Sequence, residues 1–293
     1  MTQRVLVLGA GGQLGRELLL TADPQTECIA LTRRELDIGD AGAVATRLEA
    51  LAPQVIINAA AYTAVDAAED DALAAQRANA VGPANLAQSC KDQGIRLLHV
   101  STDFVFDGRS SRPYPTDAAT APLGQYGHSK LAGEQAVSDT FSDALIMRSS
   151  WVYSRFGANF VKTMLRLMSE RDELAVVADQ VGSPTWARGL ASALWAAAAR
   201  PGLRGIYHWS DAGQCSWYDF AAAIFEEASA LGILHRAVKI SPITSSEYPT
   251  AAARPRYSVL DTTRSRQDLG LVGVQWREQL RNMLVDLKES QDE

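Results

Sequence analysis

A tyrosine and a lysine stand one helical turn apart near the middle of the chain. Tyr126 and Lys130 belong to the segment YGHSK, and residues four apart share one face of a helix. A lysine ammonium beside a phenol favours the phenolate, which lowers a phenol pKa that is ordinarily about 10. We therefore expect Tyr126 to exchange a proton with a carbonyl or alcohol oxygen near neutral pH.

A hydroxyl donor precedes this pair in the chain. Thr102 ends an apolar run within the segment STD at 101–103, where it can donate a hydrogen bond to the same substrate oxygen. A tyrosine and a lysine at this spacing also arise by chance, so the spacing alone decides little. The position of the pair, after a strand that ends in a hydroxyl, is what favours a site of proton transfer.

A glycine-rich turn, GAGGQLG at 9–15, directly follows the first apolar run. Gly9, Gly12 and Gly15 permit a tight turn, close approach of a pyrophosphate to the backbone, and close packing of a helix on a strand. The helix that follows offers free N–H groups and a partial positive charge to phosphate. An ordinary glycine-rich turn is the alternative, but the strand before it and the helix after it favour a dinucleotide site.

Two more strand ends carry candidate cofactor residues. Arg33 or Arg34, in the segment TRR, could pair with a 2′-phosphate and so favour NADPH, although solvated arginines fit this position equally well. Asp37 is a candidate partner for polar groups of adenine or ribose. The segment NAAAYT at 58–63 has small side chains that leave room for a flat ligand, and a tight contact between helix and sheet is its alternative explanation.

Composition limits the class of protein. The chain has 293 residues, of which 47% are hydrophobic and 21% charged, and its net charge is −6. We therefore expect a globular protein that binds neither nucleic acid nor a membrane, since the longest apolar stretch, 190–199, is half the roughly 20 residues a span needs. The glycine-rich start predicts no secretory signal, and three unpaired cysteines predict neither disulfides nor structural zinc. Together these features predict a cytoplasmic protein without a required metal.

Strands and helices alternate through the first half. Near-continuous hydrophobic runs are typical of strands buried on both faces of a parallel sheet, and the alternation predicts a doubly wound, Rossmann-type α/β fold. We expect a dinucleotide-binding domain over 1–150 and a smaller, mainly substrate-binding C-terminal lobe over 151–293, with later segments returning to the first domain. The expected strands are 4–8, 27–32, 54–58, 96–101 and 144–149, then 174–177, 205–208 and 238–243; the expected helices are 13–21, 41–52, 70–93, 126–141, 159–170, 186–200, 217–232 and 276–288.

These motifs together resemble a known family. The glycine loop, NAAAYTAVDAAE, STDFVFDG, YGHSKLAGE and RSSWVY are similar to the extended short-chain dehydrogenase/reductases and, more narrowly, to the dTDP-4-dehydrorhamnose reductases. The likeness extends over nearly the whole chain, through NFVKTMLRL, DQVGSPTW and YPTAAARPRYSVLDT. It implies NAD(P)H-dependent reduction of the 4-keto group of dTDP-4-dehydro-β-L-rhamnose to dTDP-β-L-rhamnose. This is the last step in dTDP-L-rhamnose biosynthesis, which supplies cell-envelope polysaccharides such as lipopolysaccharide.

The resemblance also implies roles for individual residues. Tyr126 would be the proton donor, Lys130 would bind the nicotinamide ribose and tune the tyrosine, and Thr102 would support them. Thr102, Asp103, Tyr126 and Trp151 would contact the sugar nucleotide, with the Trp151 ring as a platform for the sugar. Besides Tyr126 and Lys130, the cofactor would meet Gly9, Gly12, Gln13, Leu14, Gly15, Arg33, Asp37, Ile38, Ala59, Ala60, Ala61, Tyr62 and Thr63.

Some relatives dimerise through glutamates that hold a divalent ion. Glu17 fits one such position, but Arg188 stands where a second glutamate would be expected. We therefore predict neither that metal site nor that dimer, so magnesium is doubtful, and a monomer and a homodimer both remain open. His128 is expected to face solvent. His99 and the three tryptophans Trp186, Trp195 and Trp209 are expected to pack in the interior.

Two other functions stay open from the sequence. One is a reductase or epimerase that acts on a different nucleotide sugar. The other is a non-catalytic subunit that binds NADP and a partner protein, as one branch of the family does. The intact set of Thr102, Tyr126 and Lys130 argues against the second, because a binding subunit has no need of a proton donor.

Overall fold

A six-stranded parallel sheet forms the centre of the larger part of this computed structural model, which describes residues 3–292. The strand order is β10-β5-β4-β3-β1-β2, and every neighbouring pair runs parallel. The expected doubly wound α/β fold is therefore confirmed. The strands are β1 (Arg4–Leu8), β2 (Glu27–Leu31), β3 (Val55–Asn58), β4 (Arg96–Thr102), β5 (Leu145–Ser149) and β10 (Gly205–Trp209).

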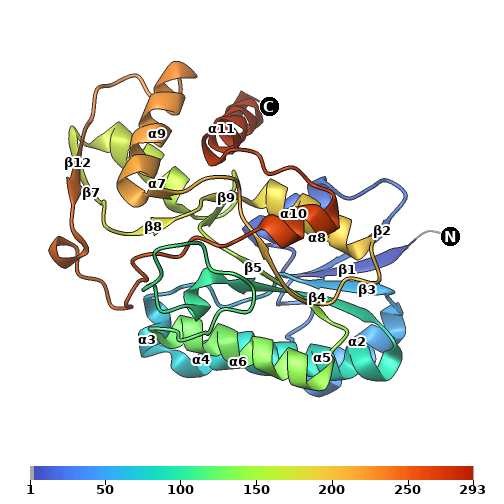
Figure 1. Ribbon diagram of the computed structural model, residues 1–293. Coiled ribbons are helices and arrows are strands. Elements are labelled where there is room, and N and C mark those ends of the chain that lie inside the picture. Colours follow the sequence, from blue (N-terminus) through green and yellow to red (C-terminus); the bar gives the residue numbers. More distant parts are fainter. Residues whose placement is uncertain (1–2, 293) are drawn as a thin grey trace.

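Helices cover both faces of this sheet (Figure 1). Alternate residues of β1 point to opposite faces, as the period of a strand requires: Leu6 and Leu8 join one apolar core, Val5 and Val7 the other. The first core is closed by α2 (Ala41–Leu51), α5 (Gly82–Gln93) and α6 (Gln125–Thr140), and the second by α1 (Gln13–Leu20), α8 (Ala187–Ala198) and α10 (Thr263–Leu269).

The single helix expected over 70–93 is wrong in its details. The structure has α3 (Ala67–Asp70), a break at Asp71, α4 (Ala72–Gln76), a π-helical turn over Arg77–Val81, and then α5. A π turn inserts one residue into a helix and is frequent at functional sites. The buried Asn79 lies in this turn, and its side chain bonds outside the helix, as described below.

A second lobe is built on the later residues (upper left in Figure 1). Here α7 (Phe160–Glu170), α9 (Trp217–Ala230) and α11 (Trp276–Asp292) enclose an apolar core with β7 (Glu173–Val177), which pairs in parallel with β12 (Lys239–Ile243). Two pairs of two-residue strands, β6 (Val152–Tyr153) with β9 (Thr185–Trp186) and β8 (Val181–Gly182) with β11 (Cys215–Ser216), were too short to predict. The division of the chain at residue 150 stays a prediction.

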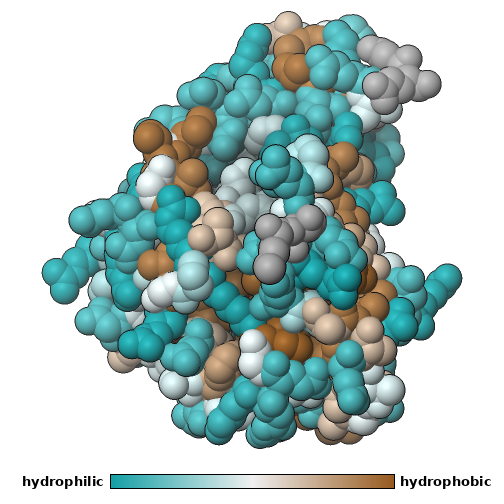
Figure 2. All heavy atoms as spheres, turned by 90° about the vertical axis from the view of Figure 1, so that its right-hand side faces the viewer, coloured by the Kyte–Doolittle hydropathy of each residue, from teal (hydrophilic) through white to brown (hydrophobic). Residues whose placement is uncertain are grey.

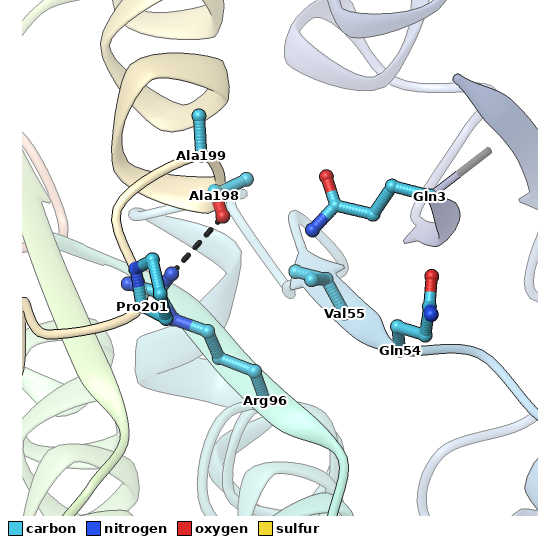
Figure 3. Close-up of a pocket in the computed structure, with 7 residues that line it drawn as sticks. All are labelled: Gln3, Gln54, Val55, Arg96, Ala198, Ala199 and Pro201. Carbon is cyan, nitrogen blue, oxygen red and sulfur yellow. Dashed lines mark hydrogen bonds between the residues drawn. The ribbon is translucent and has the colours of Figure 1, made fainter. Parts of the chain in front are cut away.

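A small hollow lies at the amino ends of β3 and β4 (Figure 3). There the Arg96 guanidinium donates to the carbonyl oxygens of Ala198, at 3.0 Å, and of Leu203, at 3.1 Å. It thereby satisfies an open carbonyl at the end of α8, where a cation is favoured. This hollow is lined by none of the predicted site residues.

Figure 2 shows the side of the molecule that lies to the right in Figure 1. Hydrophilic and hydrophobic residues are mixed on this face, and the hydrophobic ones form small groups. Among residues 3–292, no helix is long and apolar enough to cross a lipid bilayer.

Candidate active site

A cleft of about 950 Å³ runs along the carboxyl ends of the parallel strands. This edge is where open α/β sheets bind ligands, because strand ends and helix starts leave a crevice there. The structure brings every predicted site residue to this cleft; which of them contact a ligand stays a prediction. They are Gly9, Gly12, Gln13, Leu14, Gly15, Arg33, Asp37, Ile38, Ala59, Ala60, Ala61, Tyr62, Thr63, Thr102, Asp103, Tyr126, Lys130 and Trp151.

The glycine turn forms one end of the cleft. Gly9 has φ +75°, a left-handed conformation that glycine adopts without strain. A Cβ on Gly15 would lie 2.3 Å from the Gly9 carbonyl oxygen, so only glycine lets α1 pack this closely on β1. Gly12 is the N-cap of α1 and has no side chain to bond the first N–H groups of the helix. These groups face the cleft and suit a pyrophosphate.

Charged side chains flank the next part of the cleft. The Asp37 carboxylate accepts a hydrogen bond from the Gly39 N–H. It also forms an ion pair with Arg77 at 3.1 Å. Arg77 lies in the π-helical turn and lines the cleft, although nothing in its sequence context singled it out. Arg33 lines the cleft as well, whereas Arg34 is absent from its described lining. Of the two arginines of the TRR segment, only Arg33 thus belongs to the described lining of the cleft.

Tyr126 lies in the middle of the cleft, in the first turn of α6, and is 9% exposed. Burial raises the pKa of Tyr126 to about 12; the hydrogen bond with Thr102 lowers this pKa, and the charge of Asp103 raises it further. The expectation that Lys130 brings the phenol pKa toward neutrality is therefore wrong for this structure, because burial raises that pKa and Lys130 is not among the groups that shift it. A phenol that keeps its proton is the form that can donate it.

Lys130 lies one turn farther along α6 and is 2% exposed. Its Nζ donates to the Val100 carbonyl oxygen on β4 at 2.7 Å. Burial lowers the pKa of Lys130 to about 8, and the nearby charge of Glu134 opposes this shift. The Lys130 ammonium thus connects α6 to the end of the sheet, and it retains further N–H donors for a ligand.

Thr102 and Asp103 face Tyr126 from the end of β4. The Thr102 hydroxyl donates to Asp103 Oδ1 at 3.1 Å and accepts from the Phe104 N–H at 3.2 Å. Asp103 is 1% exposed, and burial raises the pKa of its carboxyl to about 6, while the neighbouring hydroxyls of Ser258 and Thr102 lower it. Its Oδ2 has no hydrogen-bond partner, so a ligand group with an N–H or O–H could bind there.

The buried Asn79 links α6, the helix that carries Tyr126, to the cleft residue Tyr62 by hydrogen bonds. Its Oδ1 accepts from the Tyr62 N–H at 2.8 Å, and its Nδ2 donates to the Tyr62 carbonyl and to Ser129 Oγ, both at 3.0 Å. Ser129 in turn donates to the Tyr126 carbonyl at 2.8 Å. Asn79 could not be singled out from its sequence context, in which the only signal is a break in the helical periodicity at 77–81.

Two tryptophans form the far wall of the cleft. Trp151 has a left-handed φ of +46°, which is rare outside glycine and marks local strain. Its ring stacks on Trp217, with centroids 3.5 Å apart and planes 7° from parallel. Both rings line the cleft. Trp217 was predicted only as the start of a helix, because the packing of α9 against Trp151 cannot be read from local sequence.

The residues expected to be structural are so placed. His99 is fully buried and accepts a hydrogen bond from Asn58 Nδ2 at 3.0 Å. Burial holds the pKa of His99 well below its usual range, and the charge of Lys130 lowers this pKa further. Trp186 and Trp209 are buried, and Trp195 donates to the Leu18 carbonyl. His128 is exposed. These outcomes confirm the four expectations of interior packing and the one of solvent exposure.

Glu17 is fully buried and already holds a cation of its own chain. Arg188 donates to Glu17 Oε2 at 2.9 Å, and Ser154 donates to Oε1 at 2.6 Å. Arg188 also donates to Asp286 at 2.7 Å, which joins α1, α8 and α11. The guanidinium charge neutralises the carboxylate, so these residues do not fit a divalent ion. Among the described residues, no cluster of three or more His, Cys, Asp or Glu could hold a metal.

Comparison with known proteins identifies the family. A family model described as the RmlD substrate binding domain matches residues 3–289. The chain belongs to this family. An Aggregatibacter actinomycetemcomitans relative described as dTDP-4-dehydrorhamnose reductase is 43% identical over 287 residues, which cover 96% of this chain and 98% of the relative.

Other RmlD-family relatives extend the comparison to structures and to other substrates. The crystal structure of a Bacillus anthracis dTDP-4-dehydrorhamnose reductase in complex with NADP is 38% identical, with a TM-score of 0.92 over 98% of this chain and 100% of that one. A Streptomyces niveus relative described as dTDP-4-keto-6-deoxy-D-glucose reductase is 42% identical and covers 89% of both chains. The fold and the family resemblance predicted from the sequence are thus confirmed.

Proposed function

We propose that this protein is an NAD(P)H-dependent oxidoreductase that reduces the 4-keto group of dTDP-4-dehydro-β-L-rhamnose to give dTDP-β-L-rhamnose. The observation that carries the proposal is the meeting of Thr102, Tyr126 and Lys130 at the centre of one cleft, with a glycine cradle at one end and two stacked tryptophans at the other. Family relatives of nearly full length support the substrate class. The site of action that fits this role is the cytoplasm, where nucleotide sugars are made.

The residues of the cleft fit a dinucleotide. The cradle at Gly9, Gly12 and Gly15 leaves room at bare backbone for a pyrophosphate, and the buried hydroxyls of Ser101 and Ser149, in the cleft wall, have no hydrogen-bond partner. Bound NADPH, or NADH, supplies the hydride that adds to the carbonyl carbon. The residues of this chain that line the cleft from Gly9 to Lys130 would hold the cofactor there.

Tyr126 completes the reduction. As the carbonyl carbon gains a hydride, its oxygen gains negative charge and takes the phenol proton, so the ketone becomes an alcohol and the phenol becomes phenolate. The single O–H of Thr102, which here donates to Asp103 Oδ1, would turn to donate a hydrogen bond to the same oxygen, and the Lys130 ammonium would attract the phenolate once it forms. Since the buried phenol has a pKa of about 12, it is fully protonated before the reaction and ready to donate.

Turnover with both coenzymes tests the proposal. NADPH or NADH oxidation is followed at 340 nm while upstream enzymes generate dTDP-4-dehydrorhamnose in place, and the product is identified as dTDP-rhamnose. Absence of turnover with either coenzyme, in a protein that binds the coenzyme tightly, contradicts the proposal.

A second candidate is reduction of a related dTDP-4-keto-6-deoxy sugar with another ring configuration. The Streptomyces niveus relative favours it, because it is about as similar to this chain as the rhamnose-forming relative is. Parallel assays with dTDP-4-keto-6-deoxy-D-glucose decide between the two by the ratio of kcat/KM.

The paired arginines offer a matched test of coenzyme preference. Arg33 lines the cleft and Arg34 does not, so Arg33→Gln should weaken NADPH binding about tenfold and leave NADH binding unchanged, as expected for loss of a charged contact to a 2′-phosphate. Arg34→Gln is the control and should alter neither. Equal effects of the two substitutions on NADPH would remove Arg33 from the cofactor site.

A further inference from the structure

Arg254 brings a positive charge to the part of the cleft that the cofactor residues do not occupy. It lies in the proline-rich loop after β12 and lines the cleft. Its Nη1 and Nη2 donate to the two carboxylate oxygens of Asp66, at 3.1 and 2.6 Å, and Nη1 also donates to the Ala252 carbonyl at 3.0 Å. A guanidinium has five N–H donors, so Nε–H and one Nη2–H stay available.

Asp66 holds this loop against the first half of the molecule. Besides pairing with Arg254, its Oδ1 accepts from the Ala252 N–H at 3.0 Å. A Cβ on Gly124, the N-cap of α6, would lie 3.9 Å from Ala252 Cβ, which places the loop beside the start of the helix that carries Tyr126. Arg254 is therefore fixed near the reacting centre and is not free to move as an exposed surface arginine would be.

The charges along the described cleft are unevenly divided. Four cationic side chains line it: Arg33, Arg77, Lys130 and Arg254. Arg33 and Arg77 lie with Asp37 on the adenosine side, and Lys130 faces the reacting atoms. The wall formed by Trp151 and Trp217 adds apolar surface and no charge. A sugar nucleotide carries a diphosphate with about two negative charges, and anions bind best to an arginine with donors to spare.

We propose that Arg254 binds the diphosphate of the sugar nucleotide and that Asp66 is a positioning residue that holds Arg254 in the cleft. The inference rests on the proposed function, because it takes a nucleoside diphosphate as the end of the substrate that does not react. The sugar then extends from Arg254 toward Tyr126, while the Trp151–Trp217 stack supplies an apolar surface for the ring faces of the ligand. The loop of Arg254 also becomes part of the substrate site and is more than a connection between elements.

The test compares two ligands that differ only in the diphosphate, dTDP and thymidine. With wild-type protein and saturating NADPH, calorimetry should show dTDP binding at least tenfold more tightly than thymidine. Arg254→Gln should lose about tenfold or more in dTDP affinity and keep the wild-type affinity for thymidine. Arg254→Lys, which keeps the charge but not the planar pair of donors, should fall between them. The matched control is Arg34→Gln, an arginine that is absent from the described lining of the cleft, which should leave the preference for dTDP unchanged.

Steady-state kinetics adds a readout that a merely structural role would not move. In Arg254→Gln the KM for the sugar nucleotide should rise about tenfold, kcat should change little, and the increase of KM with ionic strength should be smaller than in the wild type. Asp66→Asn keeps an acceptor for the Ala252 N–H but removes the charge, so KM should rise only a few-fold. NADPH affinity reports folding, and Arg254→Lys serves if Arg254→Gln does not fold.

The outcomes separate the two proposals. If wild-type protein turns over the substrate and Arg254→Gln retains the wild-type preference for dTDP over thymidine, the role of Arg254 is overturned and the proposed function stands. If wild-type protein neither turns over the substrate nor distinguishes dTDP from thymidine, both are overturned.

Discussion

The two ends of the cleft are built in different ways. The cofactor end comes from short segments that each follow a strand of one parallel sheet, namely the glycine turn after β1, Arg33 after β2 and the alanines after β3. The substrate end combines Trp151, which follows β5, with two residues from much later in the chain, Trp217 at the start of α9 and Arg254 in the loop after β12. A parallel sheet fixes the first set by its geometry, whereas the second depends on how the smaller lobe packs. Cofactor binding should therefore tolerate changes in the lobe, and substrate binding should not.

Tyr126 lies where the two ends meet, so its loss should give the largest effect. Tyr126→Phe removes the proton donor and should lower kcat about a thousandfold, in the range of a lost general acid. NADPH affinity, measured by fluorescence titration, should stay near the wild-type value because the ring remains. Tyr248→Phe, at a tyrosine that is 60% exposed, is the matched control. Wild-type turnover in Tyr126→Phe would exclude it as the donor.

Asp103, also at the junction, should limit the stability of the protein. Its carboxyl has a pKa of about 6 in the folded protein and 3.8 ordinarily. Between these values the folded state holds a proton that the unfolded state has lost, so the free energy of unfolding falls as pH rises through 6. Asp103→Asn should match wild type at pH 4 and exceed it by up to about 3 kcal/mol at pH 7 in urea unfolding.

Asp107, whose pKa is shifted in the opposite direction from that of Asp103, provides a control for this measurement. Hydrogen bonds, the largest from the Arg109 N–H, hold the pKa of Asp107 below its usual range. Its contribution is present at neutral pH and is lost in acid, so Asp107→Asn should change the slope in the opposite direction. An Asp103→Asn protein that is less stable than wild type at pH 7 would show that its carboxylate is stabilised in the fold.

Gly15→Ala tests the cofactor end. Its Cβ would lie 2.3 Å from the Gly9 oxygen, and this overpacking should cost about 1–3 kcal/mol of stability and displace the turn that faces the pyrophosphate. We expect at least a tenfold loss of NADPH affinity, with dTDP affinity of the remaining folded protein unchanged. Gly11→Ala is the control, since its nearest contact would be Thr32 Cγ2 at 3.7 Å. Equal losses in the two variants would mean that the close approach is unimportant.

Trp217→Leu tests the substrate end and should give the smallest effect. Aromatic stacking is worth about 0.5–1.5 kcal/mol, so the KM for the sugar nucleotide should rise up to about tenfold while NADPH affinity stays the same. Trp217→Phe, which keeps an aromatic face toward Trp151, should restore most of the loss. A change in NADPH affinity equal to the change in KM would break the distinction between the two ends.

The same contrast explains what could be predicted from the sequence. The strands of the sheet and the cleft residues that follow them were predictable because each lies in a local pattern, an apolar run followed by a turn. Arg77, Asn79 and Trp217 were not, since their places depend on a π turn and on packing between distant segments. The phenol pKa was mispredicted for a related reason: spacing reveals Lys130, but only the structure reveals how deeply Tyr126 is buried.

Strand β10, which is the last strand of the sheet in chain order, matters for how the chain is synthesised. All five residues of β5 are buried, and its outer edge is covered by β10, which lies about sixty residues later. A ribosome that has released only the first 150 residues therefore displays an apolar strand with an open edge, which is a template for aggregation. Nascent chains should need shielding until Trp209 has emerged, and a gene cut near codon 150 should yield insoluble product.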